Sequence, residues 1–121
     1  MIHQVDIWAF VRVMVALEDR LERDQNNSFK ALYALWEEEW MEIDQQLVNL
    51  ADTDFSAYSE MMMNTQISLE LTDANKGAFS TLVQALIEDM IGKRKETKDK
   101  EFRNDLSFEI DGLTALLKEC I

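Results

Sequence analysis

Apolar residues recur along most of the chain at the three- and four-residue spacing of an amphipathic helix. The clearest run has intervals of 4, 3, 4, 3, 4 and 3 residues, at Phe29, Tyr33, Trp36, Trp40, Ile43, Leu47 and Leu50. A heptad seam of this kind packs lengthwise against a neighbouring helix. The spacing therefore predicts one continuous helix over Phe29–Leu50, with both of its tryptophans in the core and its acidic residues facing water. Asn27 or Ser28 is expected to cap that helix.

A first helix is predicted over residues 2–24, and its first half is apolar on nearly every side. The run Ile7–Leu17 is interrupted only by Arg12. A helix that is apolar all round is central in its bundle or contacts another chain. Because one small chain can scarcely cover such a surface, we expect Trp8, Val11 or Val15 to contact a second subunit or a partner.

Three more helices complete the pattern. One follows the break at Asp52–Asp54, one begins after a cap at Thr72 or Asp73, and one begins near Lys100. Two segments are ambiguous. Residues 66–72 alternate as a strand would, but a lone strand has no evident partner, so we expect them to be helical or irregular. Residues 93–101 hold no apolar side chain and form either a loop or a solvated helical extension.

Composition agrees with a helical chain. Its 121 residues include no proline and three glycines, and 47% of them are hydrophobic. This length suits one domain, and the scarcity of helix-breaking residues favours helix throughout. The fold class predicted is therefore all-α, a single domain over residues 1–121 that forms an up-and-down bundle of four to five helices.

Charge supplies the one candidate for a functional surface. The net charge is −12, and Ala31–Asn75 contains ten acidic residues and no Lys or Arg. Such a surface repels nucleic acid and anionic membranes and attracts basic macromolecules. Acids around an aromatic anchor suit a basic protein partner. The candidate partner-binding residues are Glu37, Glu38, Glu39, Glu42, Asp44 and Trp8.

The sequence offers few residues for catalysis, for zinc binding or for phosphate binding. His3 is the single histidine and Cys120 the single cysteine, so neither a catalytic His pair nor a zinc site is expected. No Gly-rich phosphate loop is present, and no cofactor is predicted. One cysteine excludes an internal disulfide and fits a reducing cytoplasm. The eleven-residue run Ile7–Leu17 is too short to span a bilayer.

Paired carboxylates leave one enzymatic alternative open. Glu39 and Glu42 are three residues apart, and Glu70 and Asp73 repeat this spacing after twenty-seven intervening residues. The pattern resembles the ExxE…ExxD motif of the all-α nucleotide pyrophosphohydrolases, the MazG and dimeric dUTPase group. This resemblance implies that the four carboxylates, on two adjacent helices, hold Mg²⁺ over the phosphates of a nucleoside triphosphate. The chain departs from the family in the helix break that follows Leu71 and in its lack of bases between the two motifs.

The leading hypothesis is a small, acidic, non-catalytic cytoplasmic protein that binds and neutralises a basic macromolecule. Its partner would be a basic toxin, a nuclease or a nucleic-acid-binding protein, as for immunity proteins, antitoxins and anti-defence inhibitors. The alternative is a homo-oligomeric structural or adaptor bundle, for instance a homodimer, supported by the apolar first helix. A Mg²⁺-dependent pyrophosphohydrolase ranks third.

Overall fold

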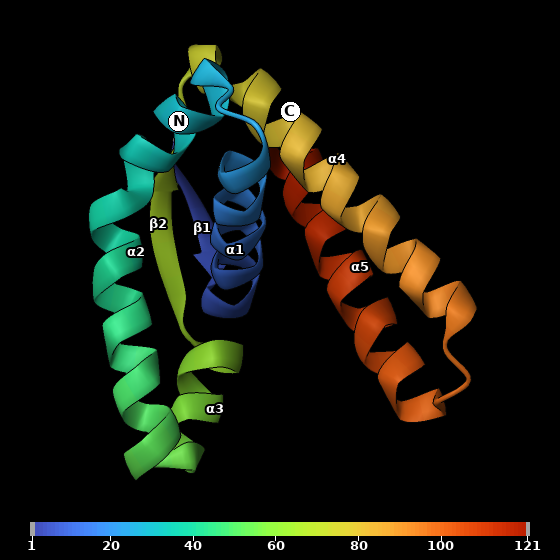
Figure 1. The fold of residues 1–121 in the computed structure, drawn as a ribbon. Helices are drawn as coiled ribbons and strands as arrows, with labels where there is room; N and C mark the ends of the chain where they lie inside the picture. Colours follow the sequence, from blue (N-terminus) through green and yellow to red (C-terminus); the bar gives the residue numbers. More distant parts are fainter. Residues whose placement is uncertain (1, 121) are drawn as a thin grey trace.

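The computed structural model describes residues 2–120 as five helices and two short strands. The order is β1 (Ile2–Asp6), α1 (Ile7–Arg23), α2 (Asn27–Thr53), α3 (Phe55–Asn64), β2 (Gln66–Glu70), α4 (Asp73–Glu96) and α5 (Lys100–Cys120). The helical bundle predicted from the sequence is thus confirmed. Helix α1 lies in the middle, with α2 on one side and the α4–α5 hairpin on the other (Figure 1). Within each of the pairs α1–α2 and α4–α5, the two helices run in opposite directions.

Helix α2 is continuous across the whole heptad seam, as predicted, and is held at its start by a side-chain cap. The Asn26 Oδ1 atom accepts hydrogen bonds from the backbone N–H groups of Ser28 (2.8 Å) and Phe29 (3.2 Å). The cap is therefore one residue earlier than the sequence indicated. Asp54 caps α3 in the same way, accepting from the Ala57 N–H at 3.1 Å. These caps satisfy N–H groups that have no partner within the helix.

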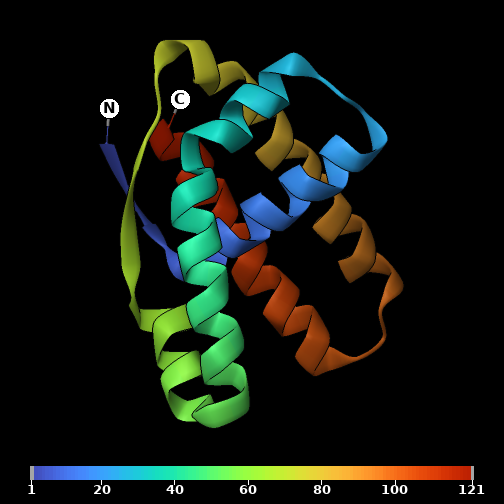
Figure 2. The ribbon, with the colours of Figure 1, turned by 60° about the vertical axis from the view of Figure 1, so that its left-hand side comes forward.

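The two strands correct the sequence prediction in two places. Residues 2–6 form β1 instead of the first turn of α1, and residues 66–70 form β2 instead of helix or irregular chain. The strands pair antiparallel, with His3 opposite Leu69 and Gln4 opposite Ser68. They lie along one edge of the molecule beside α2 (Figure 2). The partner that β2 was thought to lack is the N-terminal segment, sixty or more residues away in sequence.

An aromatic cluster joins the central helix to its neighbours. Phe10 of α1 meets Trp36 and Trp40 of α2 edge-on, with ring centroids 6.3 Å and 6.0 Å apart. Trp36 meets Phe79 of α4 at 5.8 Å and donates its indole N–H to the Glu70 carbonyl at 3.2 Å. Both seam tryptophans are buried, as predicted. One buried cluster therefore fixes α1, α2, α4 and β2 relative to one another.

The apolar surface of α1 is mostly covered within the chain, because helices pack on both of its sides. Trp8 is 6% exposed and packs against Phe108 with ring centroids 5.4 Å apart. Val11 is half-buried, whereas Val15 is 50% exposed. The expectation that one chain cannot cover this helix is wrong for Trp8, whereas the half-buried Val11 and the more exposed Val15 remain open to a partner.

The basic run 93–101 is divided between the two helices of the hairpin. Helix α4 continues to Glu96, residues 97–99 form the connection, and α5 begins at Lys100 as predicted. The Asp99 Oδ1 atom accepts from the N–H groups of Glu101 (3.0 Å) and Phe102 (3.2 Å). This charged tip is where the hairpin projects farthest from α1 (Figure 1). In residues 2–120, no helix is long and apolar enough to cross a membrane.

Candidate functional site

The structure gathers the predicted acidic residues on the outward side of α2. All five candidates are exposed: Glu37, Glu38, Glu39, Glu42 and Asp44. Because the heptad seam turns the opposite side of this helix into the core, the remaining positions must face away from it. We call these five residues the α2 acidic face.

Two apolar side chains lie in the middle of the α2 acidic face. Met41 is 63% exposed and Val48 is 56% exposed. Helical geometry, at about 100° per residue, places Glu37 and Asp44 on one side of this pair and Glu38 and Glu42 on the other. Sequence reasoning missed the pair, although its seven-residue spacing outside the heptad seam was a readable signal. The face therefore combines apolar contact area with acidic edges.

Within residues 2–120, no base forms an ion pair with this face. The ion pairs among residues 2–120 join His3 to Glu119, Arg12 to Glu109, Arg23 to Asp19, Lys76 to Asp73 and Lys93 to Asp89. None of them involves an acid of α2. About two consecutive turns of one helix thus carry like charges that no ion pair within residues 2–120 balances. The field of such a surface attracts cations and basic proteins.

Trp8 does not belong to this surface. Its indole is buried between α1 and α5, where a methyl carbon built at Gly112 would lie 2.5 Å from Trp8 Cζ2. Its assignment to a partner-binding site was made because α1 is apolar all round, and the structure shows that this property reflects a central position in the bundle. Trp8 is a core residue.

The four carboxylates of the metal hypothesis are not brought together. Glu39 of α2 and Glu70 of β2 line the same shallow hollow of about 240 Å³, but Glu42 is outside it. Asp73 is at the start of α4, where its fully exposed side chain lies 3.5 Å from Lys76. Among the described residues, no three acidic, His or Cys side chains are close enough to hold a metal ion. Glu70 is also on a strand, whereas the pyrophosphohydrolase pattern requires two adjacent helices.

Two titratable groups have displaced pKa values, and neither forms part of a catalytic arrangement. Burial raises the pKa of the Cys120 thiol from 9.0 to about 11, helped by Glu119 and opposed by Lys76. Partial burial and the neighbouring Glu18 carboxylate raise the pKa of Tyr33. Both shifts keep the group protonated at neutral pH, which does not favour a nucleophile or a general base.

Comparison of this chain with protein-family models, curated protein sequences and solved structures found no match.

Proposed function

We propose that this protein is a small acidic binding protein whose α2 acidic face covers a basic surface of another protein. One observation carries the proposal: five exposed acids of α2 form no ion pair within residues 2–120, and four of them, all but Glu39, flank the exposed Met41 and Val48. Charge complementarity guides encounter and excludes wrong partners, whereas desolvated apolar contacts hold the complex. A partner that needs to be neutralised, such as a basic toxin or nuclease, supplies the complementary chemistry. The first candidates to test are basic proteins encoded next to this chain's gene.

The test compares three forms of the chain with that partner. One is wild type. The second carries Gln or Asn in place of the α2 acidic face, and a matched control changes four Glu and one Asp that are exposed elsewhere and form no ion pair: Glu22, Glu88, Glu96, Glu101 and Asp105. Both variants remove the same charge, so only its position differs.

Association rates are then measured from about 0.1 M to about 1 M salt, where the Debye length falls from about 10 Å to about 3 Å. The α2 variant should associate at least about tenfold more slowly than wild type at low salt and show a flatter salt dependence. The control variant should keep most of the wild-type rate. Equal rates and equal salt slopes for all three forms would reduce the α2 acidic face to a solubility feature and remove the basis of the proposal.

Met41 and Val48 should affect the rate of dissociation, whereas the acids affect the rate of association. Met41→Ala and Val48→Ala remove contact area without changing charge, so they should accelerate dissociation and leave association nearly unchanged. Phe102→Ala on α5, which is 46% exposed, is the matched control. If Phe102→Ala accelerates dissociation as much as Met41→Ala and Val48→Ala do, the contact surface is not centred on α2.

A further inference from the structure

A groove between α1 and α4 differs in charge from the rest of this acidic chain. It has a volume of about 620 Å³. Its walls are one face of α1 and one face of α4, formed by Arg12, Val15, Ala16, Asp19, Arg20, Arg23, Leu82, Ala85, Leu86, Asp89, Met90 and Lys93. Each wall covers eleven residue steps, or about 16 Å at the helical rise of about 1.5 Å per residue. The volume is in the range of about 300–1,000 Å³ that is typical of small-molecule sites.

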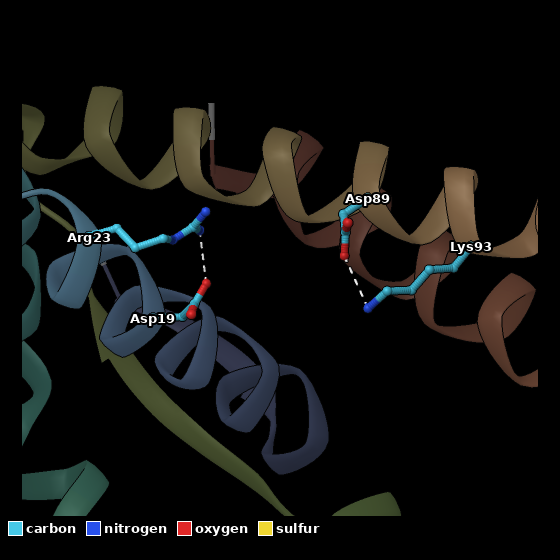
Figure 3. A network of polar contacts seen from close by, with 4 residues as sticks. All are labelled: Asp19, Arg23, Asp89 and Lys93. Carbon is cyan, nitrogen blue, oxygen red and sulfur yellow. Dashed lines mark hydrogen bonds and ion pairs between the residues drawn. The ribbon is translucent and has the colours of Figure 1, made fainter.

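The charged side chains of this α1–α4 groove include four bases and two acids. Figure 3 shows both acids, each paired with a base on its own helix. Arg23 Nη2 lies 2.8 Å from Asp19 Oδ2 on α1, and Lys93 Nζ lies 3.2 Å from Asp89 Oδ2 on α4. The side chains of both pairs are about 60% exposed or more. Pairs this exposed contribute little stability, so they can rearrange around a ligand.

Arg20 has no such partner. Among residues 2–120 it forms no ion pair, and its guanidinium carbon lies 5.5 Å from the centre of the Phe29 ring. The ring holds the cation in place without using its five N–H donors. A guanidinium fixed in this way is ready to bind a carboxylate or phosphate with two parallel hydrogen bonds. Val15, 50% exposed, lies in the same groove one and a half turns away and offers apolar surface.

We propose that the α1–α4 groove binds a small organic anion with an apolar body, its acidic head on Arg20 and its apolar part along Val15 and Leu86. This site is on a different face from α2 and does not depend on the proposed function. A small ligand fits the charge distribution better than a macromolecular one. An acidic protein would meet the repulsion of a surface with net charge −12, whereas a small anion in the groove interacts with charges inside one Debye length, about 8 Å at physiological salt.

Decanoate is the probe, and calorimetry of the full chain is the measurement. Decyltrimethylammonium has the same apolar chain with the opposite charge, and acetate has the carboxylate without the chain. The net charge of the protein favours the cation, so only a local basic site can reverse the preference. Decanoate should bind with a stoichiometry of one, more tightly than either control. Equal or tighter binding of the cation, or no binding of decanoate, would overturn the proposal.

Variants then locate the site. Arg20→Gln should weaken decanoate binding at least about tenfold, and Arg20→Lys, which keeps the charge but loses the planar fork, should lie between that variant and wild type. Arg103→Gln removes one exposed base of α5 outside the groove and should bind like wild type. Thermal unfolding establishes that each variant is folded. Equal affinities of the Arg20→Gln and Arg103→Gln variants would place the ligand elsewhere.

A second variant pair and a peptide complete the test. Val15→Asp puts an acid on the groove wall and should abolish decanoate binding, whereas Val48→Asp, at a comparably exposed position of α2, should not. A synthetic peptide of residues 34–52 tests whether an acidic amphipathic helix is the true occupant. Binding of this peptide that is lost in Arg20→Gln, without binding of decanoate, would replace the small-anion site by a protein-docking groove.

Discussion

At the residue scale, two helical glycines differ in what a methyl group would meet. A Cβ added at Gly112 would lie 2.5 Å and 2.7 Å from Cζ2 and Cη2 of the buried Trp8 indole, whereas Gly92 has nothing within 4 Å. Gly112→Ala should therefore lower the free energy of unfolding by about 1–3 kcal/mol through overpacking. Gly92→Ala should raise it by about 0.5–1 kcal/mol because alanine favours helix. Denaturant titration of both variants measures this, and a stabilised Gly112→Ala variant would contradict the close α1–α5 approach.

Cys120 should be the most informative titrating residue. Its pKa is raised to about 11, chiefly by burial, from an unfolded value of 9.0. Between these two pH values the unfolded chain loses the thiol proton while the folded chain keeps it, so stability should fall as pH rises. The loss is about 1–3 kcal/mol. Stability should fall more steeply from pH 9 to pH 11 in denaturant titrations of wild type than of Cys120→Ala, in which only other groups such as Tyr33 still contribute. Identical pH dependence in both would contradict it.

Residue burial was predictable where periodicity was strong. The positions of Trp36 and Trp40 followed from the heptad seam, and both are in the core. Trp8 was misassigned because an all-round apolar helix has two explanations, a central position or an exposed interface, and the pattern of one helix does not distinguish them. Deciding between them requires knowing that α2 and the α4–α5 hairpin pack on both sides of α1. That is tertiary information, which no local window of sequence contains.

At the scale of elements, two neighbouring asparagines allow a test of which residue caps the start of α2. Asn26 accepts two backbone hydrogen bonds and Asn27 caps nothing in the structure. Asn26→Ala should cost about 0.5–2 kcal/mol of folding free energy, because helix N–H groups lose their acceptor. Asn27→Ala should be nearly neutral. The two variants make the same substitution at adjacent positions, and denaturant unfolding measures the stability of each. An equal loss in both variants would mean that the cap is shared or placed at Asn27.

The two strands show why elements with distant partners are hard to predict. The alternation of Ile67, Leu69 and Leu71 was visible, and Leu69 is indeed buried while its neighbours in β2 are not. The matching strand was not visible, because its inward positions are His3 and Val5, and a buried histidine breaks the apolar alternation. Without a partner, a five-residue strand has no local reason to form. Its pairing is decided by packing against α2, including the Trp36 hydrogen bond to Glu70.

At the scale of the whole molecule, charge is the property that the sequence conveyed best. The stretch without Lys or Arg was readable directly, and the heptad seam of α2 implied that its acids face outward. The structure adds that none of those acids forms an ion pair with another of the residues 2–120 and that Met41 and Val48 are exposed on the same helix. The α1–α4 groove was not predictable, because its bases come from two segments about seventy residues apart that meet only in the fold.

The crowded acids of α2 should also have a cost in stability that is independent of any partner. Like charges at i,i+4 and i,i+3 on one helix repel one another by a few tenths of a kcal/mol per pair, and the net charge of −12 adds a longer-range repulsion. Replacing the α2 acidic face by Gln and Asn should therefore hold or raise the melting temperature at low salt. The control set should gain less, because two of its acids, Glu96 and Glu101, lie among the bases at the tip of the α4–α5 hairpin. Raising salt to about 1 M screens these interactions, so wild type should be stabilised more than the α2 variant and the two melting temperatures should converge.

Thermal unfolding in a salt series measures these melting temperatures. An α2 variant that melts clearly below wild type at low salt would mean that these acids stabilise the fold, and their exposure would then no longer argue for a role in binding.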